Sequence, residues 1–77
     1  MTPPQIRAAR GLLNWTAQEL AEKVGVHRNI ISNIEAGRYA GDAETLAAIR
    51  RMLEGAGVEF TNGRWPGVRL RPDKRRP

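Results

Sequence analysis

Apolar residues recur at helical spacing over the first 55 positions of this 77-residue chain and alternate with polar residues after that. The helical spacing predicts helices at about 3–12, 17–24 and 28–36. It predicts a fourth that begins after Asp42 and ends near 55–57. The alternation predicts two short strands on either side of Asn62-Gly63, the strongest hairpin signal in the chain. The pattern therefore predicts a mainly α fold, a compact bundle of four helices with a short C-terminal β-hairpin.

The hairpin signal also predicts a register. With Asn62 and Gly63 as the two turn residues, Phe60 falls opposite Trp65. The second strand must then absorb Pro66 and Gly67, which interrupt regular pairing and predict a bulge or a bend.

Residues 16–37 read as two short helices joined by a turn. Thr16 is a candidate N-cap, and Glu19 stands three residues later, at capping-box spacing. Gly25 supplies the left-handed residue that ends the first of these helices. In the second, Ile31 and Ile34 form an inward face. Its Arg and Asn side chains project elsewhere, where Arg can bond guanine and Asn adenine.

These residues resemble the helix-turn-helix family of phage repressors and Cro-like, Xre-type bacterial regulators. The matching stretches are QELAEKVGV (18–26) and IISNIEAGR (30–38). The later stretches RRMLEGAGVEF (50–60) and PGVRLR (66–71) resemble very short single-domain bacterial regulators with a C-terminal hairpin. The resemblance implies a lambda-repressor-like bundle that binds double-stranded DNA.

The resemblance also implies which residues meet the bases. Arg28 and Asn29 match positions near the start of the recognition helix, and Asn33 matches a position one turn later. His27 stands at the usual N-cap of that helix, where the family commonly has Ser or Thr. It either contacts DNA or serves only as a poor cap. Ile30 either packs inward or offers a methyl contact to thymine.

Phosphate contacts are expected around the start of the helix at 17–24. The family often has Gln at its first residue, where this chain has Ala17. Gln18 can take that role only if the helix rotates slightly, although backbone N–H groups there can still hold a phosphate. Thr16 and Arg38 are further candidates. Their alternatives are a pure capping role and a solvated loop charge.

Arg10 and Glu35 match a family pair that joins the first helix to the end of the third. We expect them to form a structural ion pair. If the pair is partly buried, loss of one partner leaves an uncompensated charge.

The net charge of +5 is unevenly distributed. Residues 1–63 are balanced, with seven basic and seven acidic residues, whereas residues 64–77 have six basic residues and one acidic residue. We therefore expect a neutral domain at 1–57, a hairpin at 58–71 and a disordered basic tail at 72–77. The chain has no cysteine, no apolar run that could span a membrane and no signal peptide, which predicts a cytoplasmic protein.

An enzymatic role finds no support, because one His, no Cys and no closely spaced acidic pair leave no catalytic set. No cofactor and no metal are expected. A chain this small often gains stability by oligomerising. The apolar residues of the hairpin are more than one bundle needs, so we expect a homodimer interface there: Val58, Phe60, Trp65, Val68 and Leu70.

The sequence thus predicts a DNA-binding transcriptional regulator that holds a palindromic operator as a homodimer, with repression favoured over activation. Two other functions remain open. One is an antitoxin-like autoregulator whose C-terminal segment binds a partner protein. The other is an RNA or general nucleic-acid binder driven by the basic tail.

Overall fold

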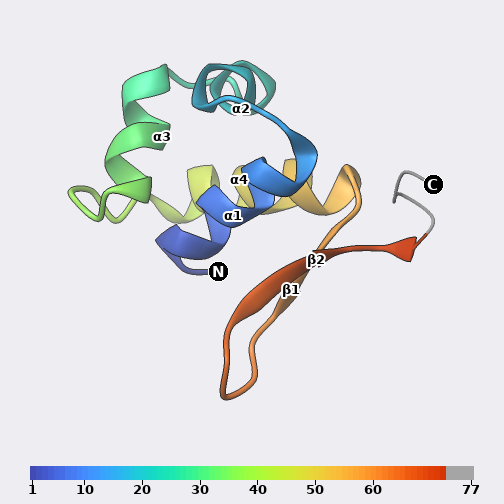
Figure 1. Cartoon of the computed structure of the whole chain (residues 1–77). Coiled ribbons are helices and arrows are strands. Elements are labelled where there is room, and N and C mark those ends of the chain that lie inside the picture. The colour runs from blue at the N-terminus through green and yellow to red at the C-terminus, as the bar shows by residue number, and fades with distance from the viewer. Residues whose placement is uncertain (73–77) are drawn as a thin grey trace.

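Four helices and one antiparallel hairpin make up residues 1–72, the part of the chain that the computed structural model describes (Figure 1). The mainly helical fold with a C-terminal hairpin is confirmed. Among the described helices, none has both the length and the apolar content needed to cross a bilayer. The elements are α1 (Pro3–Leu13), α2 (Ala17–Val24), α3 (Arg28–Glu35), α4 (Ala43–Gly55), β1 (Val58–Thr61) and β2 (Gly67–Leu70).

Each helix begins at a side chain that caps it. Thr2 and Thr16 both form capping boxes, in which the threonine and the residue three positions later satisfy each other's backbone N–H groups. Asp42 accepts a hydrogen bond from the backbone N–H of Thr45 at 2.8 Å. Short-range polar signals therefore set where the helices start, as the sequence predicted.

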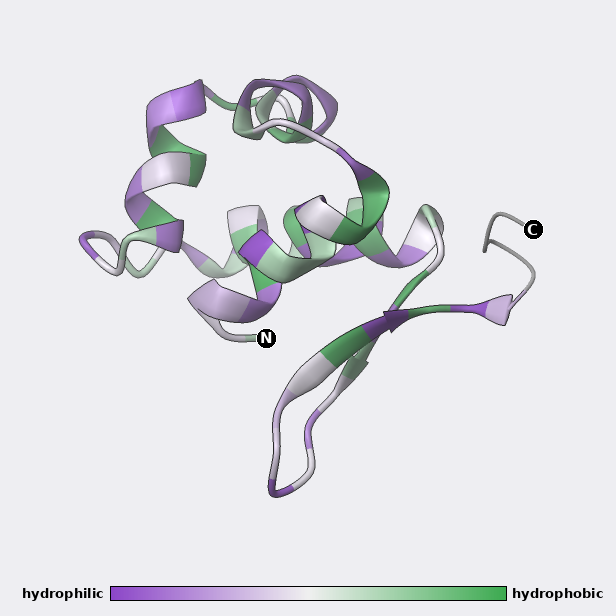
Figure 2. Cartoon of the chain, viewed as in Figure 1, coloured by the Kyte–Doolittle hydropathy of each residue, from purple (hydrophilic) through white to green (hydrophobic). Residues whose placement is uncertain are grey.

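The core lies where the inward faces of the helices meet β1 (Figure 2). Small residues allow close packing: Ala9 of α1 and Ala21 of α2 have no exposed surface. The larger buried side chains are aliphatic, as a chain with few aromatic residues requires. They are Ile6, Leu20, Ile31, Ile34, Ile49, Leu53 and Val58.

The predicted hairpin register is wrong. Phe60 pairs with Val68 rather than with Trp65, and Thr61 pairs with Gly67. The loop therefore has five residues, 62–66, in place of a two-residue Asn-Gly turn. Pro66 lies in this loop and is not absorbed into the second strand.

The observed register has two physical causes. It places the apolar residues of both strands opposite one another, Val58 against Leu70 and Phe60 against Val68. It also sets Glu59 against Arg69, whose Nε lies 2.9 Å from the carboxylate. The predicted register differs by an odd number of residues, which would turn one strand's apolar face outward. Pro66 also lacks the N–H that a ladder position needs.

The hairpin is tied to α1 by one buried amide side chain, that of Gln5. Its Nε2 group donates to the backbone oxygens of Thr61, at 3.0 Å, and Gly67, at 2.9 Å. This holds the base of the loop against α1, while the loop itself extends beyond the helices (Figure 1). Of the predicted disordered tail, only Pro72 belongs to the described residues; 73–77 lie outside them.

Candidate nucleic-acid interface

Helix α3 presents opposite faces to the core and to solvent. Ile31 and Ile34 are buried against α1 and α2. The side chains of Arg28 and Asn29 are exposed in its first turn, and that of Asn33, one turn later, is half-buried. The structure thus brings the three residues predicted to read bases onto one short helix. Ile30 packs against the edge of the core, which favours the inward of its two predicted roles.

His27 is the N-cap of α3. The backbone N–H of Asn29 donates to its Nδ1 atom at 3.0 Å. The cap is therefore made, although by an unusual residue for that position. Because a neutral imidazole that accepts at one nitrogen carries its proton on the other, the exposed Nε2–H is a donor. The ring can thus cap α3 and donate a hydrogen bond outward at the same time.

A tight turn fixes α3 relative to α2. Gly25 adopts a positive φ of 85° and its N–H donates to the oxygen of Ala21 at 2.8 Å. The N–H of Val26 donates to the same oxygen at 3.0 Å. The turn predicted at Gly25 is confirmed. It lets α3 pack directly against α2, where Ala21 is fully buried.

The far end of α3 is held by the predicted ion pair, which is present. Arg10 donates from Nε and Nη2 to the two oxygens of Glu35, both at 2.7 Å. Its Nη1 donates to the backbone oxygen of Trp15 at 3.0 Å. Glu35 is 8% exposed and Arg10 is 18% exposed. The hydrogen bonds that Arg10 donates to Glu35 raise the pKa of Arg10 above its ordinary value, against the opposing effect of burial. α3 is therefore anchored at both ends, by its cap and by this pair.

The start of α2 offers two backbone N–H groups to a phosphate. The capping box uses those of Thr16 and Glu19, at 3.2 and 3.0 Å. The amides of Ala17 and Gln18 complete the first turn, where no carbonyl of the helix can reach them. The Gln18 side chain is exposed. The carboxylate of Glu19 lies beside them and opposes the approach of an anion.

Arg38 is exposed in the loop after α3. Its backbone N–H donates to the oxygen of Asn33 at 2.9 Å, which closes the end of the helix and leaves the guanidinium outside. Within residues 1–72, no three His, Asp or Glu side chains gather in a way that could hold a metal ion.

The arrangement of a capped short helix, a glycine turn and an exposed polar first turn is what a helix needs to enter the major groove. A family model described as Helix-turn-helix matches residues 6–58, more than half of the chain. The chain belongs to this family, in its Xre-type, lambda-repressor-like branch. It is a DNA-binding transcriptional regulator. No curated protein matches it.

The five hairpin residues predicted to form a dimer interface lie in different surroundings in the regulator. Val58 is 2% exposed and belongs to the core. Phe60, Val68 and Leu70 are half-buried and pack against the core. Trp65, in the loop, is 83% exposed. The dimer interface stays a prediction, and Trp65 is the member of the set with most surface to offer it.

Sequence reasoning missed Gln5. The Thr2–Gln5 spacing signals a capping box, but nothing along the chain indicates that the same amide also bonds to two carbonyls of the hairpin. The signal that exists is the residue type itself. A Gln on the apolar face of a helix, next to Ile6, needs buried partners.

Proposed function

We propose that the regulator represses transcription as a homodimer on a palindromic operator, with Arg28, Asn29 and Asn33 reading base edges. One observation carries the proposal: the first turn of α3 is polar and exposed while its other face is buried by Ile31 and Ile34. An Arg side chain such as Arg28 can bond a guanine bidentately, and the two asparagines suit adenine.

His27 supports this role by its two nitrogens. Its Nδ1 is occupied by the cap of α3, so the ring cannot turn without breaking that bond. A fixed outward donor beside Arg28 suits a phosphate or a base acceptor. We therefore place His27 among the DNA contacts, with the cap as its second role.

Backbone contacts would come from both sides of α3. On one side, the first-turn amides at Ala17 and Gln18 face outward with the positive end of the α2 dipole. Thr16 contributes by holding those amides in place through its capping box. On the other side, the guanidinium of Arg38 is exposed in the loop. Such contacts fix the position of a protein on the duplex and carry no sequence information.

The length of α3 supports a dimer on a symmetric site. Eight residues span about 12 Å of helix axis, which matches about three to four base pairs at their rise. A site that short recurs throughout any genome, so one copy cannot select a promoter. Two copies related by a two-fold axis would double the site and make it palindromic. A dimer seated over a promoter represses by excluding polymerase.

The test is selection of bound sequences from a random duplex pool, followed by titration of the best site. We expect a palindrome with half-sites about 10 base pairs apart or a multiple of that spacing. Arg28→Ala should weaken the best site by about 1–3 kcal/mol and relax the preference at one base pair. Arg51→Ala, an exposed arginine on α4, is the matched control and should change neither.

Each other outcome has a clear meaning. Equal binding to unrelated duplexes or to RNA at moderate salt would support a general nucleic-acid binder. An unchanged site preference in Arg28→Ala would remove this residue from base reading. A selected site without symmetry would contradict the dimer.

A further inference from the structure

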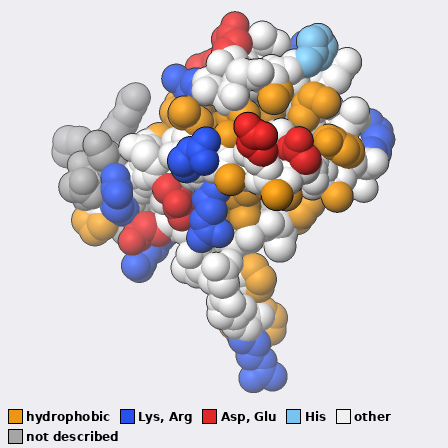
Figure 3. All heavy atoms as spheres, turned by 180° about the vertical axis from the view of Figure 1, so that it is seen from behind, with side chains coloured by type: hydrophobic (Ala, Val, Ile, Leu, Met, Phe, Trp, Pro, Cys, Tyr) orange, Lys and Arg blue, Asp and Glu red, His pale blue; other side chains and the backbone are white. Residues whose placement is uncertain are grey.

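The hairpin loop exposes a tryptophan that nothing in the described chain covers. Trp65 lies in the five-residue loop beyond the last strand pair, Thr61 with Gly67, and is 83% exposed. Figure 3 shows hydrophobic and basic side chains together at the tip of the hairpin. The tip lies at the opposite end of the molecule from the turn between α2 and α3 (Figure 1). The indole is therefore remote from the duplex that the first turn of α3 would contact.

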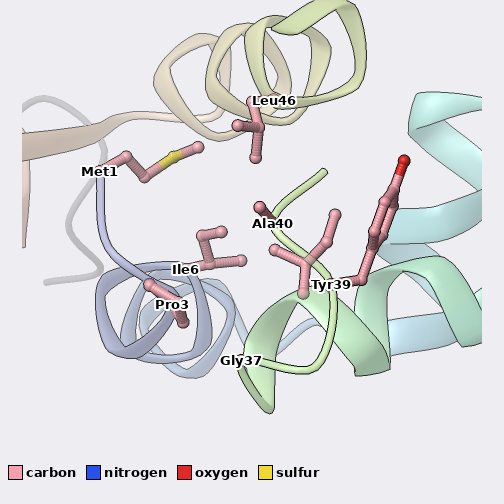
Figure 4. Close-up of a pocket in the computed structure, with 8 residues that line it drawn as sticks. Met1, Pro3, Ile6, Gly37, Tyr39, Ala40 and Leu46 are labelled. Atoms are coloured by element: carbon pink, nitrogen blue, oxygen red, sulfur yellow. The ribbon is translucent and has the colours of Figure 1, made fainter. Parts of the chain in front are cut away.

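The same protein has an apolar pocket of about 310 Å³ (Figure 4). It is bounded by the start of α1, the end of α3, the loop 37–41 and the first turns of α4. Figure 4 shows the Ile6, Ala40 and Leu46 side chains converging on it, with Met1 and Tyr39 at its sides. No charged side chain lines it. Ile34, on the inward face of α3, is also part of its wall.

We propose that Trp65 of one copy occupies this pocket in a second copy, and that its own pocket receives the Trp65 of that copy. This reciprocal exchange deepens the proposed function, because it rests on the homodimer and names its contact. Gln5 holds the base of the loop against α1 through the carbonyls of Thr61 and Gly67. The loop then extends away from the helices, so its indole is offered to a neighbour (Figure 1).

The occupant follows from size and chemistry. The pocket has room for an indole and an apolar wall to bury it, with the Tyr39 ring and the Met1 thioether as aromatic and sulfur partners. A symmetric dimer needs a contact that is complementary to itself. One exposed indole and one apolar pocket on each copy meet that requirement.

The buried area agrees with a weak dimer. A tryptophan buries about 150–250 Å², so two of them bury about 300–500 Å². The walls of a concave pocket lose less area than the side chains that fill them, so the total stays below the roughly 1,000 Å² that a specific, stable interface buries. We therefore expect a dimer that dissociates on dilution and that operator DNA strengthens by holding two copies side by side.

The experiment uses the full chain with Trp15→Phe, in which Trp65 is the single tryptophan. Its fluorescence and its sedimentation are followed over a range of protein concentrations. We expect the emission to shift to the blue and iodide quenching to fall as the dimer forms. Trp65→Ala should raise the dimer dissociation constant by about thirtyfold or more, the range for a central aromatic anchor.

Two further variants test whether the pocket itself, and Trp65 rather than the rest of the loop, is needed for the dimer. Ala40→Phe fills the pocket from its exposed rim and should also abolish the concentration-dependent shift. Asn62→Ala, in the same loop, should leave dimerisation unchanged. If Ala40→Phe fails to fold, Leu46→Ala enlarges the pocket and should weaken the dimer, while the emission of Trp65 in the monomer stays as in the parent.

Three results would overturn the inference. They are a Trp65→Ala protein that dimerises as well as the parent, a Trp65 that stays exposed in the dimer, and a Trp65 that is buried at all concentrations. The last would mean that the indole folds into its own pocket. A dimer that survives Trp65→Ala and still binds a palindrome leaves the proposed function intact. A protein that is monomeric on and off DNA removes both.

Discussion

The pair α2–α3 and the hairpin β1–β2 are held in place by contacts of very different range. In α2 and α3, the defining hydrogen bonds join residues two to five positions apart: Thr16 with Glu19, His27 with Asn29, and Val26 with Ala21. The hairpin depends on Gln5, which lies 56 and 62 positions from the two carbonyls that it bonds. The pair α2–α3, proposed to contact DNA, is therefore specified mainly by local sequence, and the hairpin by the assembled fold.

The largest expected effect is loss of the Arg10–Glu35 ion pair, which joins the end of α3 to α1. Arg10→Ala leaves the largely buried carboxylate of Glu35 without a partner and should lower the free energy of unfolding by about 3 kcal/mol. Urea denaturation measures it. Glu54→Ala is the control, because its pair with Arg50 is exposed and should contribute about 0.5 kcal/mol or less. Equal losses in the two variants would contradict the role given to burial.

The second prediction breaks the long-range tie alone. Gln5→Glu keeps the oxygen that serves the α1 capping box but replaces the group that donates to Thr61 and Gly67. The loss should be about 2 kcal/mol, as expected for unpaired buried polar groups. Hydrogen exchange should rise in the hairpin and little in α2 and α3. Thr2→Ala, which removes the cap only, should cost about 1 kcal/mol and leave the hairpin protected. Uniform loss of protection in Gln5→Glu would show that hairpin and helices open together.

The third prediction compares two glycines. Gly41 has a φ of +82°, and a Cβ there would lie 3.1 Å from Ile34 Cδ1 and 3.2 Å from Leu46 Cδ2. Gly41→Ala should destabilise the protein by about 1–2 kcal/mol. Gly11, within α1, has nothing within 4 Å of that position. Gly11→Ala should therefore stabilise by about 0.5–1 kcal/mol. Thermal unfolding measures both changes in stability. A change in the same direction in both variants would contradict the prediction.

The smallest effect concerns the cap of α4 and its dependence on pH. Hydrogen bonds from Thr45 lower the pKa of Asp42 below its ordinary value of 3.8. A lowered pKa means that the native state favours the carboxylate. Its contribution is therefore present above about pH 4 and is lost as the pH falls through the folded-state pKa. Asp42→Asn keeps a capping oxygen but does not titrate. In thermal unfolding between pH 5 and pH 2, the melting temperature of the variant should therefore fall less than that of the parent protein.

The sequence predicted the helices closely because their signals are local. Thr2, Thr16 and Asp42 stand where a cap must stand, and apolar spacing then gives the buried faces. The Arg10–Glu35 pair spans 25 positions, and it was expected only because a resemblance to known regulators pointed to it. Helix-capping residues and the spacing of apolar residues give no information about contacts between residues so far apart in the chain.

The hairpin register shows the limit of local signals. Asn62-Gly63 is a strong turn signal, but the register that it favours would place Phe60 against Trp65 and leave Val68 and Leu70 without apolar partners. Packing on α1 and the pairing of Glu59 with Arg69 decided between registers. These contacts form only when distant parts of the chain meet. The placement of Arg28, Asn29 and Asn33 on α3 was predictable from the sequence, whereas the exposed surface of Trp65 depended on this register.

Helix α1 has a consequence for how the two regions communicate. It supplies both Gln5, which holds the hairpin, and Arg10, which holds the end of α3, five residues or about 7.5 Å apart along one rigid rod. We therefore expect a displacement of the hairpin to affect the position of α3, the helix proposed to contact DNA. If binding of a partner at the hairpin changes the affinity for the operator by some factor, operator binding must change the affinity for that partner by the same factor. One continuous helix thus makes direct contacts with both the hairpin and the end of α3.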